Sequence, residues 1–133
     1  MKISNQFKVF FVFLLFTVGC YSQTTNTKVK ARIVYEENDR IIKITGTAEN
    51  LTDILQSMSY SLSVIKKNSS NDNTSNNVQE GFFNLGPNEN KNLSTTQINL
   101  GNEDEVIVLL LFYDESKKLI GKDRVVFGEE KKK

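Results

Sequence analysis

The run from Ser57 to Val64 constrains the fold more than any other part of the chain, because it reads Ser-Met-Ser-Tyr-Ser-Leu-Ser-Val. Every second side chain is apolar, and the residues between are serines. This two-residue period belongs to a β-strand with one buried face and one face in water. An amphipathic helix would repeat its apolar side chains every three to four residues, so this segment is predicted to be a half-buried strand.

The rest of the chain follows the same pattern. From Lys28 to Phe127 it divides into seven short runs rich in β-branched and aromatic residues, separated by clusters of Asn, Asp, Gly and Ser. Helical spacing is not sustained. This pattern predicts an all-β, immunoglobulin-like sandwich of about seven antiparallel strands, with a barrel as the competing architecture. The strands are expected near residues 28–36, 40–50, 57–67, 79–85, 91–99, 105–113 and 118–127.

Other segments predict how these strands are placed and joined. The run from Val106 to Tyr113 is apolar on both faces, as in a central strand that is covered on each side or lies against a partner. Residues 114–118 are predicted to form a turn, so the last two strands should make a hairpin. Residues 38–39 should do the same for the first two strands. Residues 68–77 contain no apolar side chain, which predicts a long flexible hairpin loop.

The amino terminus has the anatomy of an export signal. Lys2 and Lys8 accompany an apolar stretch over residues 9–18, which is too short to span a membrane as a helix. Two processing routes remain open: ordinary cleavage after Ser22, which is favoured, or lipidation of Cys20, the only cysteine. The predicted organisation is a signal peptide at 1–22, a short linker at 23–27, a sandwich domain at 28–128 and a charged tail at 129–133.

Composition excludes several classes of function. The chain has 17 basic and 16 acidic residues, and loss of two lysines with the signal leaves 15 basic residues and a net charge of −1, so nucleic acid is not an expected partner. The chain has no histidine, the commonest general base and metal ligand. We expect no catalytic residues, no metal and no cofactor. The acidic run from Glu103 to Glu105 is predicted to be a solvated turn and not a calcium loop.

Basic residues alternate with apolar ones in the first predicted strand. Lys28, Lys30 and Arg32 would lie on one face of that strand, about 7 Å apart. They could guard an edge strand against unwanted pairing, or they could form a surface that contacts an acidic or polar polypeptide. Four further residues would extend this surface if they fall on the same side: Lys66, Lys67, Lys122 and Arg124.

Several short motifs follow one another in a defined order along the chain. A Tyr-x-Leu-x-Val strand leads through a polar loop into a Ser-x-x-x-Gln-x-Gly-x-Phe segment, and a Leu-Ser stretch ending in Asn precedes a closing Tyr-Asp turn. The residues that make up these motifs are Tyr60, Leu62, Val64, Ser75, Gln79, Gly81, Phe83, Leu93, Ser94, Asn99, Tyr113 and Asp114. In this order and spacing the chain resembles the curli-assembly chaperone family CsgH, which is related to CsgC in fold and role.

The resemblance implies an immunoglobulin-like, exported chaperone that keeps curli-type amyloid subunits from polymerising before they leave the cell. Such a protein would bind its clients transiently and act as a monomer in the periplasm. It would contact a membrane only if Cys20 were lipidated, which would anchor it in the outer membrane. The resemblance also implies that Phe83 points into the core and that Gln79 hydrogen-bonds a turn. The alternative function is a surface or periplasmic adhesion or accessory binding module.

Overall fold

All seven predicted strands form, and they follow one another in the predicted order. The structure, a computed structural model, describes residues 25–128; the predicted signal peptide with Cys20, the first two linker residues and the tail lie outside this range. The described residues contain no helix, and so none long and apolar enough to cross a membrane. The strands are β1 (Val29–Asn38), β2 (Ile41–Asn50), β3 (Gln56–Asn68), β4 (Thr74–Leu85), β5 (Asn90–Asn99), β6 (Asp104–Tyr113) and β7 (Leu119–Phe127).

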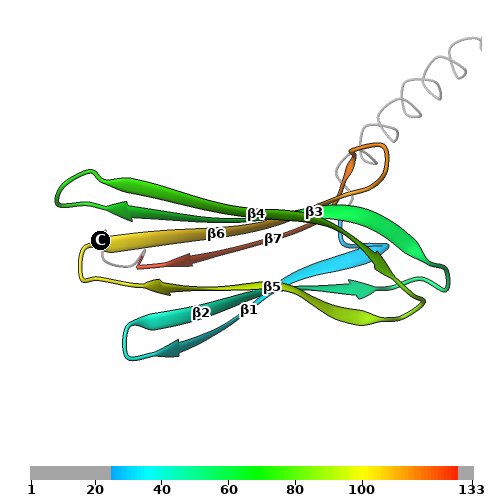
Figure 1. Cartoon of the computed structure of the whole chain (residues 1–133), viewed down its shortest axis with the longest axis horizontal. Helices are drawn as coiled ribbons and strands as arrows, with labels where there is room; N and C mark the ends of the chain where they lie inside the picture. Colours follow the sequence, from blue (N-terminus) through cyan, green and yellow to red (C-terminus); the bar gives the residue numbers. More distant parts are fainter. Residues whose placement is uncertain (1–24, 129–133) are drawn as a thin grey trace, which may run out of the picture.

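The strands form two sheets that lie face to face (Figure 1). One sheet has three strands in the order β1-β2-β5, and the other has four in the order β4-β3-β6-β7. Every neighbouring pair is antiparallel. Two separate layers confirm the predicted sandwich over the competing barrel, and the pairing of β6 with β7 confirms the predicted closing hairpin.

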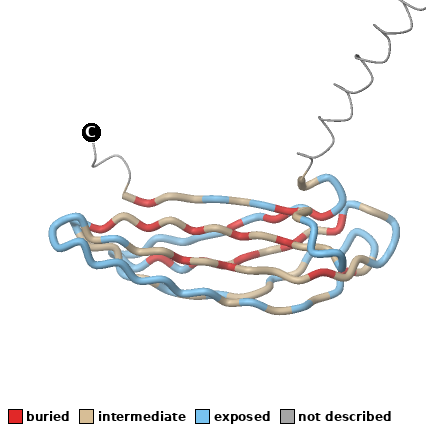
Figure 2. Tube along the Cα trace, turned by 90° about the horizontal axis from the view of Figure 1, so that it is seen from above, coloured by how far each residue is buried: buried red, intermediate tan, exposed pale blue. Residues whose placement is uncertain are grey.

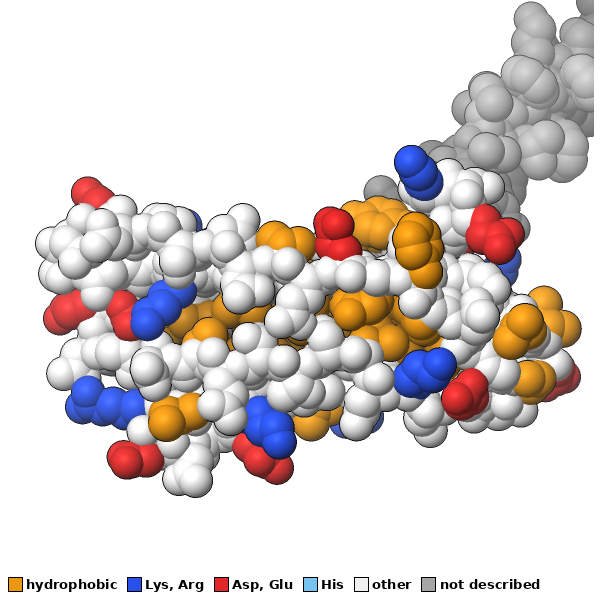
Figure 3. Space-filling view, viewed as in Figure 1, with side chains coloured by type: hydrophobic (Ala, Val, Ile, Leu, Met, Phe, Trp, Pro, Cys, Tyr) orange, Lys and Arg blue, Asp and Glu red, His pale blue; other side chains and the backbone are white. Residues whose placement is uncertain are grey.

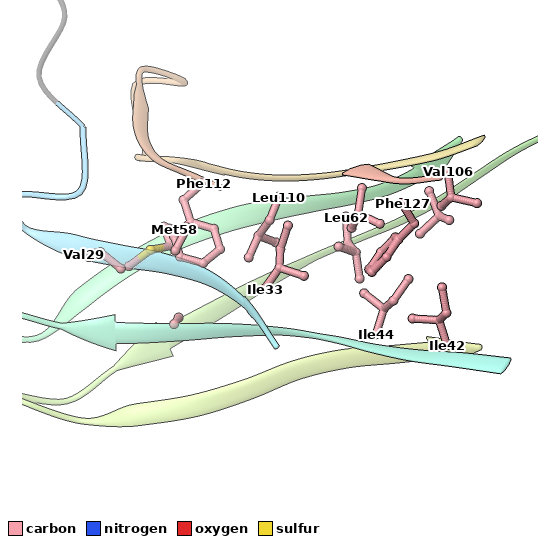
Figure 4. Close-up of a cluster of buried hydrophobic side chains, with 14 of the residues drawn as sticks. Val29, Ile33, Ile42, Ile44, Met58, Leu62, Val106, Leu110, Phe112 and Phe127 are labelled. Atoms are coloured by element: carbon pink, nitrogen blue, oxygen red, sulfur yellow. The ribbon is translucent and has the colours of Figure 1, made fainter. Parts of the chain in front are cut away.

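The core lies between the two sheets and follows the predicted alternation. In β3 the buried side chains are Met58, Leu62 and Val64, and the serines between them face outward and are half-buried. Figure 2 shows the same alternation of buried and more exposed positions along several strands. Both sheets contribute to the cluster labelled in Figure 4, which contains Val29, Ile33, Ile42, Ile44, Met58, Leu62, Val106, Leu110, Phe112 and Phe127.

β6 is a central strand, as predicted, but only one of its two apolar faces is covered. The face that includes Leu110 and Phe112 is completely buried against the three-stranded sheet. The opposite face is half-exposed on the outside of the sandwich and carries four apolar side chains: Ile107, Leu109, Leu111 and Tyr113.

The predicted long loop at residues 68–77 is wrong in its extent. β4 already begins at Thr74, and the residues up to Val78 pair with the end of β3, so the connection spans only residues 69–73. Asn68 closes this connection: its backbone N–H donates to the Asn73 carbonyl at 2.9 Å, and its side-chain oxygen accepts from the Ser70 N–H at 3.1 Å. Polar residues can extend a hairpin beyond the core because the ladder needs only backbone partners.

Asp104 corrects the prediction that the acidic run is a solvated turn. Its side chain is only 7% exposed. It accepts hydrogen bonds from the Asn68 amide at 2.7 Å and the Gly101 N–H at 2.8 Å, and it forms an ion pair with Lys66 at 3.4 Å. Burial opposes the charged form, but these hydrogen bonds and the Lys66 charge outweigh it and hold the pKa of Asp104 below its ordinary value. The carboxylate therefore ties together the ends of β3 and β6.

Asn50 performs a similar task at the opposite end of the sandwich. Its amide nitrogen lies within hydrogen-bonding distance of the carbonyls of Ile54 (2.8 Å), Leu85 (3.1 Å) and Gly86 (2.9 Å). Its side-chain oxygen accepts from the N–H of Thr52 at 2.9 Å and from the Thr52 hydroxyl at 2.7 Å. One buried side chain thus joins the β2–β3 connection to the turn between β4 and β5.

Candidate polypeptide-binding surface

Lys30 and Arg32 lie on the outer face of the three-stranded sheet. They alternate along β1 with the buried residues Val29, Ala31 and Ile33, so strand geometry directs both basic side chains into solvent. Lys28, the third basic residue of the predicted set, is exposed immediately before β1. The structure therefore places this part of the predicted contact surface on the outer face of the sandwich, along β1.

The surroundings of these residues are polar. Lys30 is opposite Glu49 and Arg32 is opposite Thr47 in the β1–β2 register, and the Thr47 hydroxyl donates to the Arg32 carbonyl at 2.9 Å. A depression of about 370 Å³ follows this face from β1 across β2 to the start of β5; its lining is Lys30, Arg32, Val34, Thr47, Ala48, Glu49, Asn90, Lys91 and Asn92. Such a surface can accept hydrogen bonds and a carboxylate from a polypeptide.

The remaining predicted basic residues do not extend this surface. Lys66 points inward and is paired with Asp104. Lys67, Lys122 and Arg124 lie on the outer face of the four-stranded sheet, because they sit one residue out of phase with the core positions of β3 and β7. The prediction required these four residues to lie on the same side of the sandwich as Lys28, Lys30 and Arg32, and they do not. The strand order puts them on opposite faces of the sandwich.

A second outer surface was not predicted as a site. It combines the half-exposed apolar residues of β6 with two apolar side chains of β4, Val78 at 47% and Phe82 at 92% exposed. The outward serines of β3 lie between them. The signal was present in the sequence, because two consecutive phenylalanines in a strand must point to opposite faces. One of them, Phe82, therefore had to point away from the core.

The residues of the Tyr-x-Leu-x-Val and Gly-x-Phe motifs belong to the core. Tyr60 and Phe83 meet edge to face at 5.9 Å between ring centroids, and Phe83 meets Phe112 at 5.4 Å. The expectation that Phe83 points inward is confirmed. Gly81 leaves room for the Tyr60 ring, since a Cβ there would lie 3.0 Å from it. Leu62 and Val64 are buried.

The other motif residues have different surroundings. Gln79 lies inside β4 opposite Leu62, so the expectation that it hydrogen-bonds a turn is wrong. That expectation failed because β4 begins five residues earlier than predicted. Ser75 is exposed near the start of β4. Tyr113 faces outward at the end of β6, and Asp114 shapes the turn that follows by accepting from the N–H groups of Ser116 and Lys118, both at 2.9 Å.

The two long sides of the sandwich differ. β1 packs along β7, whereas β4 and β5 make few contacts with each other. Figure 3 shows this second side, with hydrophobic side chains visible between the layers. The partly buried residues packed against the core include Phe83 of β4 together with Leu93 and Ile98 of β5.

The outer faces of the two sheets carry groups that can bind a partner. Among residues 25–128 no three Asp, Glu, His or Cys side chains converge in a group that could hold a metal ion. The one described carboxylate with a shifted pKa, Asp104, has its oxygens engaged by structural partners. The outer faces offer hydrogen-bonding groups, charges and apolar side chains to a partner.

Comparison with protein-family profiles and with curated proteins finds no match. Among solved structures, the E. coli curli protein CsgC aligns with a TM-score of 0.59 at 14% identity, over 72% of this chain and 96% of that chain. R. palustris CsgH aligns with a TM-score of 0.49 at 14% identity, over 74% of this chain and 87% of that chain. A β-glucuronidase of Bacteroides uniformis gives 0.49 at 9% identity, over 74% of this chain but only 14% of the enzyme. The chain therefore has a CsgC-like fold, which agrees with the resemblance seen in its motifs.

Proposed function

We propose that this protein is an exported chaperone that prevents curli-type fibre subunits from polymerising prematurely into amyloid. The observation that carries the proposal is the match of its fold to the curli protein CsgC over 96% of that chain. The order of the sequence motifs supports the same assignment. The function is one of transient binding, and the subunits of the fibre are the clients.

A rigid sandwich suits this task for a physical reason. Amyloid subunits expose strand edges whose unpaired N–H and C=O groups template the next chain. A folded domain with a polar outer face can bind such a segment without being recruited into the fibre, because its own strands are already paired around a buried core. We assign the first contact to the outer face of the three-stranded sheet, where Lys28, Lys30 and Arg32 are exposed.

The site of action proposed for the protein is the periplasm, which it reaches through the amino-terminal signal. Lipidation of Cys20 would instead anchor it in the outer membrane. The mass of the mature amino terminus distinguishes the two routes. A chain beginning at Gln23 is expected, and a diacylated cysteine at the terminus would establish the anchored form.

The function is tested by mixing the purified exported protein with a curli-type subunit at a low molar ratio and following thioflavin T fluorescence. We expect the lag before fibre growth to lengthen several-fold, because a chaperone that acts on early aggregates works below equimolar amounts. An unchanged lag time would contradict the proposal.

The contact residues are tested with two matched triple variants. Changing Lys28, Lys30 and Arg32 to Glu reverses three charges on one face, and changing Lys67, Lys122 and Arg124 to Glu does the same on the opposite face. The first variant is expected to lose most of its effect on the lag and the second to keep it. Far-UV circular dichroism of both variants checks the fold. Equal loss in the two would show that net charge matters and the proposed face does not.

A further inference from the structure

Side chains occupy the first half of one edge of the three-stranded sheet. On β1 the N–H of Ala31 donates to the Asn26 side-chain oxygen at 3.1 Å, and the N–H of Ile33 donates to an Asp123 carboxylate oxygen at 2.7 Å. Asn26 also bonds both backbone groups of Lys122 in β7. The donors of Ala31 and Ile33 are therefore occupied, and a further strand cannot pair with this part of the edge.

The other edge of the same sheet, formed by β5, is open. The Leu100 N–H donates to the Arg40 carbonyl at 2.8 Å, which fixes the phase of the β2–β5 ladder. Since bonded and non-bonded positions alternate in an antiparallel pair, the backbone N–H and C=O groups of Thr95, Gln97 and Asn99 point away from β2. In the described part of the chain, no side chain makes a hydrogen bond to these groups.

The open stretch has defined ends. At its start a register shift interrupts the ladder beside Leu93. Near the same end the Lys91 ammonium donates to the Asn84 carbonyl of β4 at 3.0 Å and bridges the two layers. From Ser94 to Asn99 the strand is regular, which gives a length of roughly 20 Å for a docking segment of about six residues.

The side chains beside this edge are unusual for an exposed strand. Natural edges are commonly protected by charges, prolines or bulges. Here the outward residues of the open stretch are Thr95, Gln97 and Asn99, all exposed and none charged. Amide and hydroxyl side chains of this kind pair well with Asn, Gln, Ser or Thr on an adjacent strand.

The inward row of the same stretch consists of Ser94, Thr96 and Ile98, and it is incompletely covered. Ile98 and Leu93 pack against the core but remain partly exposed, and β4 makes little contact with β5. Apolar side chains of an added strand would point into this side of the sandwich, where Figure 3 shows hydrophobic side chains between the layers. The edge thus offers backbone pairing, an amide-rich outer row and an inward side on which Ile98, with Leu93 just before the stretch, supplies apolar contact.

We infer that the β5 edge from Ser94 to Asn99 binds an extended client segment as an additional strand. The segment that fits has apolar residues alternating with Asn, Gln, Ser or Thr. This inference rests on the proposed function for the identity of the client, and it assigns the place and mode of binding. Strand addition supplies affinity through the backbone and selectivity through alternate side chains.

The binding mode is tested by residue-resolved hydrogen exchange on the exported protein. The probe is a soluble, end-capped octapeptide in which Gln alternates with Val. The amides of Thr95 and Gln97 are expected to exchange at least tenfold more slowly at saturating peptide, while those of Ala31 and Ile33 do not change. Unchanged exchange in β5 would overturn the inference. Protection of β5 without peptide that grows with protein concentration would also overturn it, because a second copy would then be the occupant.

Three variants separate backbone pairing from general effects. Gln97→Pro removes an outward N–H without removing a donor to β2, and Gln97→Lys introduces a charge at the open edge. Asn76→Lys places the same charge on β4, on the outer face of the opposite sheet, where Asn76 is exposed. Both Gln97 variants should bind the peptide at least tenfold more weakly, and Asn76→Lys should bind it normally. Equal binding by all three would refute strand addition.

Failure of the strand-addition inference can be distinguished from failure of the proposed chaperone function. If the protein delays fibre growth but its β5 amides are not protected by peptide, the chaperone function stands and the edge is not the site. If the β5 amides are protected but the thioflavin lag is unchanged, the edge binds strands and the proposed function fails.

Discussion

Replacing Asn50 with alanine is expected to destabilise the fold substantially. The side chain is 1% exposed and makes contacts to three carbonyls and to Thr52. An amide nitrogen has only two hydrogens, so the three carbonyls share them. Of these three bonds, the one to the Leu85 carbonyl is buried. In the alanine variant water does not reach this carbonyl to replace the lost donor.

The magnitude follows from these contacts. Leaving one buried acceptor without a donor costs about 1–3 kcal/mol, and the lost bonds to Thr52 add about 1 kcal/mol. The free energy of unfolding should therefore fall by about 2–4 kcal/mol, a large share of the roughly 5–15 kcal/mol of a typical domain. Urea denaturation followed by far-UV circular dichroism measures this change.

Two further variants make the prediction specific. Asn84→Ala removes an exposed amide from β4 and should change the free energy of unfolding by less than about 0.5 kcal/mol. Asn50→Asp keeps the acceptor for Thr52 but sets a carboxylate oxygen against the carbonyls, so it should be destabilising at neutral pH and recover as acid protonates it. If Asn50→Ala cost no more than Asn84→Ala, the assigned role of the buried amide would be refuted.

Three other changes test the interior. Because the folded-state pKa of Asp104 is lowered, its stabilisation should be present above about pH 4 and be lost as acid protonates it; Asp104→Asn should lower the urea midpoint at neutral pH and flatten its fall in acid. Ser94→Ala removes a buried hydroxyl oxygen that has no hydrogen-bond partner, and it should raise the free energy of unfolding by about 1 kcal/mol in the same assay. Gly121→Ala would place a Cβ 2.7 Å from the Phe112 ring and should lower the thermal midpoint, at a cost of about 1–3 kcal/mol.

The sequence predicts the strands well where side chains alternate sharply in polarity. β3 is recognised because serines alternate with buried residues such as Leu62. The start of β4 is missed because Thr74 to Asn77 carry no apolar side chain, and that part of the strand is held only by pairing with β3. Pairing between two strands depends on their backbones and does not require buried side chains. The periodicity of side chains within one segment therefore does not predict it.

The site is less predictable because it depends on how the strands are ordered. Alternation alone distinguishes the inward Lys66 from the outward Lys67. It does not reveal that Arg32 and Arg124 lie on opposite faces, since that follows from the division of the strands between two sheets. Asp104 is buried because its partner Asn68, 36 residues away, meets it across the β3–β6 pair.

The Asn26 contacts also have a consequence for the order in which the domain is completed. Asn26 stands near the start of the domain, and its partner Lys122, 96 residues later, stands near the end. Synthesis proceeds from the amino terminus, so β1 is present long before Asp123, which occupies the Ile33 donor, and before Lys122, which holds Asn26. A nascent or truncated chain that stops before β7 therefore exposes the Ile33 donor and lacks the Lys122 contacts that hold Asn26 beside Ala31, so this edge is protected against strand pairing only when the last strand arrives.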